Sequence, residues 1–191
     1  MTWIETIRPD DADGDLKTLY AAIGSARGGV ADVHRAQSLH PRALRAHMEL
    51  YKAVVLARST LSRVARERIA VTVSAANRCA YCVAHHSEAL RQLRDDPEII
   101  DALGRGVISA QLSEADAALL RWARQGADAP HASEARQIEA LRALGFDDRS
   151  ILDATLTVAY FSFVNRLVLL LGVDLEGDYQ ATCGDDGGRE G

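Results

Sequence analysis

Hydrophobic residues recur along the chain at intervals of three and four positions, a spacing typical of α-helices with one buried face. In residues 41–57, for example, Leu44, Met48, Tyr51 and Val55 form a single apolar stripe. Glycine and proline fall between the helical runs, and no segment shows the strict alternation that predicts a strand. We therefore expect an all-α protein, a multi-helix bundle of eight or nine helices.

Residues that favour helix N-termini stand just before several of the predicted helices. These N-cap candidates are Asp15, Ser59 or Ser62, Asn77, Asp96, Ser113 and Asp147. The helices are expected at about residues 16–23, 41–57, 62–76, 78–93, 97–103, 114–125, 134–144 and 148–171. The run at 62–76 is apolar on several sides, which predicts a central, deeply buried helix.

The predicted helices indicate one domain, residues 1–176, with a weak internal two-fold repeat. Residues 41–93 carry an outer helix followed by a buried one, and residues 113–171 repeat this order without cysteines. The remaining residues, 177–191, are rich in glycine and aspartate and are expected to be disordered. Cys183 in this tail is expected to be an exposed thiol without a role.

Composition narrows the class of protein. Of the 191 residues, 48% are hydrophobic and 26% are charged, as in ordinary soluble domains, and the net charge is −5. Arginines alternate with acidic residues along the predicted helix faces, which argues against nucleic-acid binding. The N-terminus lacks an export signal, and the longest strongly apolar run, residues 167–173, is too short to span a bilayer. We expect a cytoplasmic protein that binds neither nucleic acid nor a membrane.

Reactive side chains concentrate in residues 67–86, which we call the motif segment. Cys79 and Cys82 form a C-x-x-C pair, and His85 and His86 follow it. In a chain without an export signal, this cysteine spacing indicates redox or metal chemistry. On a helix, Cys79, Cys82 and His86 would share one face. The histidines elsewhere in the first half of the chain are assigned no chemistry: His34, His40 and His47.

Glu67 begins the motif segment but can reach the cysteines only if the helix is interrupted. On one straight helix, Glu67 would lie about 22 Å from Cys82 along the axis, at ~1.5 Å per residue. A break at Asn77 would let Glu67 face the cysteines from a neighbouring helix. If Asn77 caps the second helix, Cys79 and Cys82 fall in its first turns, where the helix dipole favours a thiolate.

This arrangement predicts a thiol peroxidase. A thiolate attacks the peroxide and becomes a sulfenic acid, which the neighbouring thiol converts to a disulfide. His86 with Glu67 would pass the protons that this reaction requires. Three other functions remain open: a metal-binding protein that uses Cys79, Cys82 and one histidine, a non-catalytic redox sensor, and a decarboxylase or lactone-processing enzyme.

The motif segment resembles the alkylhydroperoxidase D-like branch of the carboxymuconolactone decarboxylase family, in its peroxidase-related subgroup. The residues that carry this resemblance are Arg66, Glu67, Asn77, Cys79, Tyr81, Cys82 and His86, with His40-Pro41 and Asn165-Arg166 in the flanks. The resemblance implies an all-helical protomer assembled into trimers or hexamers, with no bound cofactor or metal. It also implies reduction of hydrogen peroxide or an organic hydroperoxide, with a thiol or lipoyl-type compound as reductant.

The resemblance also implies a role for each site residue. Cys82 would attack the peroxide, Cys79 would resolve the sulfenic acid, and Glu67 and His86 would relay protons. Tyr81 stands where the best-known family pattern has a histidine, and its hydroxyl is a much weaker base at neutral pH. His85 is an additional histidine that is a candidate to compensate for this difference.

Overall fold

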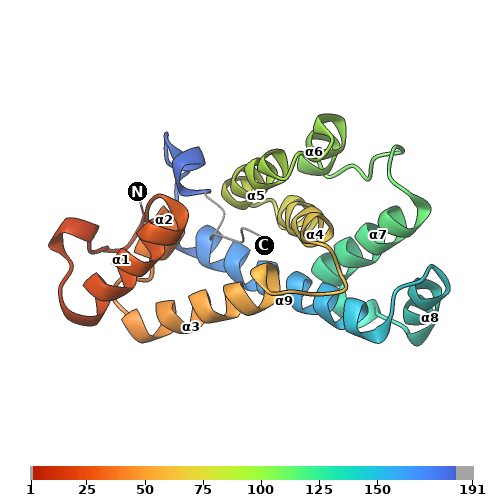
Figure 1. The fold of residues 1–191 in the computed structure, drawn as a ribbon, viewed down its shortest axis with the longest axis horizontal. Coiled ribbons are helices and arrows are strands. Elements are labelled where there is room, and N and C mark those ends of the chain that lie inside the picture. The colour runs from red at the N-terminus through yellow and green to blue at the C-terminus, as the bar shows by residue number, and fades with distance from the viewer. Residues whose placement is uncertain (1, 184–191) are drawn as a thin grey trace.

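The structure is a computed structural model and describes residues 2–183. Within these residues there are nine α-helices and no β-strand, so the predicted all-α fold is confirmed. The internal repeat and the domain boundary at residue 176 stay predictions. Figure 1 shows the helices gathered around α4, with α1 and α2 at one end of the molecule and α8 at the other.

The helices follow the hydrophobic pattern closely. In chain order, the first half contains η1 (Pro9–Asp11), α1 (Gly14–Arg27), α2 (Asp32–Arg35), α3 (Pro41–Tyr51), η2 (Lys52–Leu56), α4 (Arg63–Ala76) and α5 (Ala80–Gln92). The second half contains α6 (Pro97–Gly104), α7 (Glu114–Asp128), η3 (Pro130–Ala132), α8 (Ala135–Ala143), α9 (Asp148–Leu171) and η4 (Tyr179–Thr182). The predicted helix at 41–57 is therefore α3 extended by the single π-helical turn η2.

α4 forms the centre of the hydrophobic core, as its sequence predicts. It packs against α5, α6, α7 and α9, so most of its surface faces protein (Figure 1). Its apolar residues Ile69, Ala70, Val71 and Val73 are completely buried. Because Glu67 lies on the same helix, its carboxylate is also carried into the interior.

Four of the predicted N-caps are present with the expected hydrogen bonds. The side chains of Ser62, Asp96, Ser113 and Asp147 each accept a hydrogen bond from a backbone amide in the first turn of α4, α6, α7 and α9. The prediction for Asp15 is wrong, because α1 already begins at Gly14 and Asp15 lies inside its first turn. The prediction for Asn77 is also wrong, with a consequence for the site that is described below.

The C-terminal segment differs from the sequence-based expectation. Residues Tyr179–Thr182 form the short 3-10 helix η4, which contacts α1 and α5, whereas disorder was expected from Gly177 onward. Cys183 is buried, so the prediction of an exposed thiol is wrong. The Cys183 sulfur lies 3.3 Å from Nδ1 of His85, which helps to hold the segment in place. The rest of the predicted tail, residues 184–191, lies outside the described residues.

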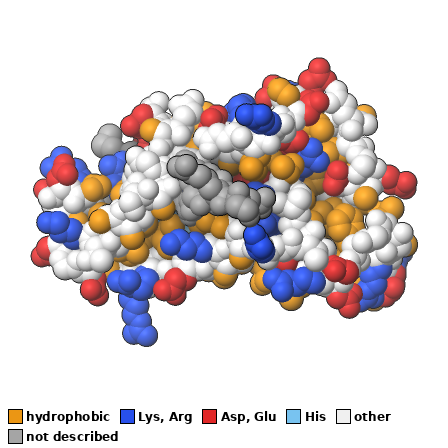
Figure 2. Space-filling model, in the orientation of Figure 1, with side chains coloured by type: hydrophobic (Ala, Val, Ile, Leu, Met, Phe, Trp, Pro, Cys, Tyr) orange, Lys and Arg blue, Asp and Glu red, His pale blue; other side chains and the backbone are white. Residues whose placement is uncertain are grey.

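α9 is a long, apolar helix that contributes many buried residues to the hydrophobic core. Within residues 2–183 it is the one helix that is long and apolar enough to cross a membrane. It packs against α4, α7 and α8 and carries the buried polar residues Asp153 and Asn165. On the face shown in Figure 2, outside the residues drawn in grey, basic and acidic side chains are interleaved around hydrophobic patches.

Candidate active site

A tight turn between α4 and α5 brings the two cysteines to the start of α5. Asn77 ends α4, and Arg78 adopts a left-handed conformation with φ 57°. The amide of Cys79 donates to the carbonyl of Ser74 at 2.9 Å, and the amide of Arg78 donates to that of Ala75 at 3.1 Å. This hydrogen-bond pair is the Schellman motif, which closes the C-terminus of a helix. The chain therefore turns back through a C-cap of α4, and not through an N-cap at Asn77.

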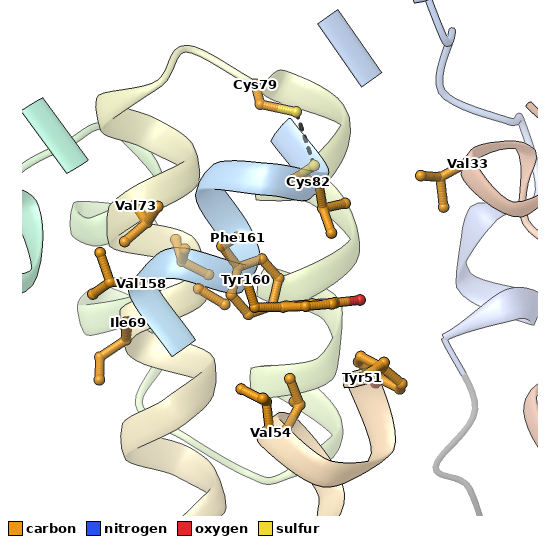
Figure 3. Packing of buried hydrophobic residues seen from close by; sticks show 14 of the residues in the cluster. Val33, Tyr51, Val54, Ile69, Val73, Cys79, Cys82, Val158, Tyr160 and Phe161 are labelled. Carbon is orange, nitrogen blue, oxygen red and sulfur yellow. Dashed lines mark hydrogen bonds between the residues drawn. The ribbon is translucent and has the colours of Figure 1, made fainter. Parts of the chain in front are cut away.

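Cys79 itself occupies the N-cap position of α5, so Cys82 lies one turn into the helix. The two sulfur atoms are 2.8 Å apart and point toward one another (Figure 3). Both cysteines are free thiols and both are buried. Because a disulfide bond measures about 2.05 Å, the pair needs to close by less than about 1 Å to form one.

The two thiols have opposite pKa shifts. A hydrogen bond from the Cys82 thiol, assisted by the Cys82 backbone amide, lowers the pKa of Cys79. The hydrogen bond with Cys79 raises the pKa of Cys82 well above its ordinary value, and burial and the charge on Cys79 act in the same direction. Cys79 therefore loses its proton more readily than Cys82.

Asn165 on α9 lies beside the cysteine pair and interacts with both thiols. It is fully buried, its Oδ1 accepts from Nδ2 of Asn77 at 2.9 Å, and its Nδ2 donates to Oγ of Ser74 at 3.1 Å. Its side-chain amide also lowers the pKa of both thiols, because an N–H donor stabilises a thiolate. Asn77, the predicted N-cap, thus fixes the amide that faces the thiols.

Glu67 reaches the site through His86. One carboxylate oxygen of Glu67 lies 2.6 Å from Nδ1 of His86, and the other accepts from Nε of Arg63 at 2.9 Å. Burial alone would raise the pKa of Glu67, but His86 and Arg63 lower it to about 2. The carboxylate is therefore ionised at neutral pH and accepts hydrogen bonds only, so Nδ1 of His86 must carry a proton. Nε2 of His86 is then the ring nitrogen that remains for proton exchange.

Tyr81 and His85 belong to a separate hydrogen-bond network centred on Glu176. The Tyr81 hydroxyl accepts from the amide of Val33 at 3.2 Å and donates to Glu176 at 2.9 Å. The other oxygen of Glu176 lies 3.2 Å from Nε2 of His85. Burial raises the pKa of Tyr81 and lowers that of His85. Both side chains thus help to hold the segment after α9, and their hydrogen bonds are made to Val33, Glu176 and Cys183 and not to Cys79 or Cys82.

A small cavity adjoins Cys82, and its volume is about 40 Å³. Four of the six predicted site residues line it: Tyr81, Cys82, His85 and His86. The other lining residues come from α1, the α1–α2 region, α3 and α9: Arg27, Ala31, Val33, His34, His47, Tyr51, Tyr160, Phe161 and Val164. Cys79 and Glu67 do not line the cavity and act on it only through Cys82 and His86.

The sequence did not identify three polar residues that line this cavity: Arg27, His34 and His47. His47 was assigned no chemistry, yet it is buried, with Nε2 at 2.7 Å from the Tyr160 hydroxyl. A signal for His47 was present, because it stands three residues after Leu44 and four before Tyr51 on the apolar stripe of α3. His34 and Arg27 carry no such signal, since they lie at the ends of short or glycine-rich segments.

The described part of the chain contains no cluster of side chains that matches a metal site. Among residues 2–183, no three side chains of His, Cys, Asp or Glu are grouped so that they could hold a metal ion. The side chains near the cysteines have other partners, since His86 is bound to Glu67 and His85 to Glu176.

Comparison with known proteins identifies relatives of this fold and site. The model of the carboxymuconolactone decarboxylase family matches residues 41–125, which include the whole motif segment. Comparison with curated proteins finds no significant match. A solved structure of an alkylhydroperoxidase AhpD core, an uncharacterized peroxidase-related protein from Ralstonia eutropha JMP134, has a TM-score of 0.86 and 25% identity, and the match covers 95% of this chain and 96% of that one.

Two further structures are similar over almost the whole chain. An uncharacterized peroxidase-related protein from Silicibacter sp. TM1040 has a TM-score of 0.84 and 28% identity, with 95% of each chain covered. The debrominase Bmp8, in complex with 2,3,4-tribromopyrrole, has a TM-score of 0.79 but only 19% identity over 95% of this chain and 96% of that one, so it shares the fold alone. Residues 41–125 thus match the carboxymuconolactone decarboxylase family, and almost the whole chain is similar in fold to solved structures of an alkylhydroperoxidase AhpD core and a peroxidase-related protein.

Proposed function

We propose that the protein is a thiol-dependent peroxidase that cycles between the Cys79–Cys82 dithiol and a disulfide. The observation that carries this proposal is the 2.8 Å separation of the two sulfur atoms at the N-terminus of α5, beside a cavity. Two thiols at this distance need to approach by less than about 1 Å to form a disulfide. The peroxidase-related proteins from Ralstonia and Silicibacter support the same assignment by their names. We place the activity in the cytoplasm.

Cys82 is the sulfur that attacks the peroxide. Accessibility and charge favour different cysteines, because Cys82 lines the cavity while the lowered pKa belongs to Cys79. Accessibility decides, since Cys79 is completely buried and cannot meet a peroxide. A proton that moves across the 2.8 Å contact transfers the negative charge from Cys79 to Cys82 before the attack.

The two cysteines and His86 supply the electrons and protons that reduction of the peroxide requires. A proton first passes from the cysteine pair to Nε2 of His86, which leaves the Cys82 thiolate. The thiolate forms a sulfur–oxygen bond, the oxygen–oxygen bond breaks, and the departing oxygen takes that proton back from Nε2 of His86. The products are a sulfenic acid on Cys82 and water or an alcohol. The Cys79 thiol condenses with the sulfenic acid to give a disulfide and a second water. A dithiol of the lipoyl type reduces this disulfide by thiol exchange.

Substitution of Cys82 tests the proposal directly. Cys82→Ser removes the attacking sulfur, so hydrogen peroxide consumption with dithiothreitol or dihydrolipoamide as reductant should fall to the rate without protein. Peroxide can be followed by a colorimetric assay. Cys183→Ser is the matched control, because it removes the third cysteine, which lies outside the pair, and it should keep most of the activity.

The outcome also separates the alternatives. Peroxide consumption at the wild-type rate by Cys82→Ser would refute the assignment. A wild-type protein that forms the Cys79–Cys82 disulfide once, yet shows no turnover with either reductant, would be a redox sensor. Zinc bound in a 1:1 ratio after purification without chelators would favour a metal-binding protein.

A further inference from the structure

The cavity beside Cys82 has features of a site for a very small polar ligand. Its volume of about 40 Å³ exceeds the roughly 10–15 Å³ that a cavity needs to hold one water molecule. A cavity that accepts benzene measures about 150 Å³, so an aromatic ring does not fit here. Three of the side chains that limit the space are labelled in Figure 3: Val33, Tyr51 and Tyr160.

One wall of the cavity carries a buried polar atom that lacks a partner. Nδ1 of His34 has no hydrogen-bond partner, and only 7% of the residue is exposed. Buried polar atoms are nearly always hydrogen-bonded, so an atom of this kind in a cavity wall indicates a ligand. The neighbouring His47 differs, because its Nε2 bonds to Tyr160 and its Nδ1 bonds to Gln37.

The side chains around the cavity favour a neutral peroxide and stabilise the negative charge that forms when its oxygen–oxygen bond breaks. Burial and the nearby Arg27 lower the pKa of both His34 and His47, to about 4 for His47, so both rings are neutral at pH 7. A neutral imidazole nitrogen accepts a hydrogen bond from a hydroxyl group or donates one to it. The positive charge of Arg27 stabilises the negative charge that develops on the departing oxygen.

We propose that this cavity selects hydrogen peroxide over hydroperoxides that carry an aromatic ring, and that His34 holds the peroxide beside Cys82. The proposal rests on the peroxidase function proposed above and assigns its substrate class and one binding residue. The hydroxyl of hydrogen peroxide bonds to Nδ1 of His34, which leaves the oxygen–oxygen bond next to the Cys82 sulfur.

Single-turnover oxidation tests the selectivity without knowledge of the natural reductant. The reduced protein is mixed with hydrogen peroxide or cumene hydroperoxide, and the loss of free thiols is followed by alkylation and mass spectrometry. Free dithiothreitol provides the intrinsic reactivity ratio of the two oxidants. Relative to that ratio, we expect the protein to favour hydrogen peroxide by about tenfold or more.

Each outcome has a distinct meaning. A protein ratio equal to that of dithiothreitol, or a preference for cumene hydroperoxide, would overturn the selectivity while the peroxidase function stands. Failure of both oxidants to oxidise the Cys79–Cys82 pair would overturn the peroxidase function itself.

Two substitutions of one residue test the binding role of His34. His34→Leu removes the polar atom and should slow oxidation by hydrogen peroxide about tenfold, the usual effect of losing one hydrogen bond to a ligand. His34→Asn places a polar group near the position of Nδ1 and should restore the rate to within about threefold. His131→Asn, at an exposed histidine in η3, controls for the substitution itself.

Comparison of His34→Asn with His34→Leu separates the loss of a hydrogen bond from a defect in packing. A role of His34 in packing alone predicts that leucine, an apolar side chain of similar size, is tolerated better than asparagine. Equal rates for His34→Leu and the wild type, or a slower rate for His34→Asn than for His34→Leu, would exclude the hydrogen bond to the peroxide.

Discussion

Glu67 shows how one buried carboxylate controls the site through a neighbour. It is completely buried, and its two hydrogen-bond partners are His86 and Arg63. These interactions more than offset the cost of burial, as the pKa of about 2 shows. Glu67 therefore remains ionised throughout the neutral range and orients His86. It is a positioning residue, and His86 is the group that exchanges protons.

The lowered pKa of Glu67 makes part of the stability dependent on pH. A carboxyl group whose pKa is lower in the folded protein stabilises it above the pKa of the unfolded chain, about 4.5. This contribution is lost as the pH falls toward the folded value of about 2. The shift corresponds to about 3 kcal/mol of unfolding free energy. Urea unfolding between pH 6 and pH 2.5 should show this loss in the wild type.

Glu67→Gln provides the comparison, because glutamine has no charge to lose. Its unfolding free energy should be lower at pH 6 and should vary less between pH 5 and pH 2.5 than that of the wild type. The variant should also lose peroxidase activity by about a hundredfold, because an amide can donate to Nδ1 and place the ring proton on Nε2. Parallel pH curves for the two proteins would contradict the ion-pair assignment.

The residues of the motif segment could be predicted from sequence because their types and spacing carry chemistry. A straight helix excludes Glu67 from the site, so a turn near Asn77 followed from geometry alone. Cys183 and Glu176 could not be predicted, because their burial depends on the path of the chain after α9. No local pattern records that path, so a glycine-rich tail was expected to be disordered.

At the scale of elements, the turn between α4 and α5 contains local strain. Arg78 has a φ of 57° at the position of the Schellman motif that glycine usually occupies. A left-handed conformation costs a side chain such as arginine roughly 1 kcal/mol. In return, the turn places Cys79 at the N-cap of α5, where its sulfur contacts that of Cys82.

Replacement of Arg78 should therefore reveal the strain. Arg78→Gly should raise the unfolding free energy by about 0.5–1 kcal/mol in urea, since glycine adopts positive φ without strain. Arg78→Ala removes the same charge but keeps the strained conformation, so it should not stabilise the protein. Equal stability of the two variants would show that the left-handed conformation carries no cost at this position.

Helix boundaries were predictable where a cap residue and the apolar pattern agree. Ser113 and Asp147 are examples, because each precedes a strong apolar stripe and accepts a hydrogen bond in the first turn. The boundary at Asn77 was misplaced because asparagine is favoured at both helix ends. The π-helical turn η2 could not be predicted, since it packs against α4 and α9 and carries no local signal in the sequence.

At the scale of the whole molecule, α9 retains an apolar stripe on its outer side. Leu152, Leu156, Phe163 and Leu170 are exposed and recur at intervals of four and seven residues, so they lie on one face. Leu170 is 74% exposed. Exposed stripes of this kind usually mark a contact with another protein chain. We propose that copies of this chain cover the stripe in a trimer or hexamer, as the family resemblance implies.

The assembly can be tested in solution. Light scattering coupled to size-exclusion chromatography should give a mass three or six times that of the 20.7 kDa chain. Leu170→Glu places a charge in the stripe and should shift the protein toward monomers, whereas Leu175→Glu, at an exposed leucine after α9, should not. A monomer at micromolar concentration in the wild type would exclude this role for the stripe.

The Glu176 network also has a consequence for the timing of synthesis. Glu176 accepts hydrogen bonds from Tyr81 and from the amide of Asp32, and it bonds to His85. Because Tyr81 and His85 line the cavity, this part of the cover around the thiols is held in place by a late segment. Roughly 90 residues separate Cys82 from Glu176, and chains grow at about 5–20 residues per second. The thiols of a nascent chain thus exist for about 5–20 s before their cover can form. Each new molecule is more open to oxidants and thiol-reactive compounds in this interval than at any later time.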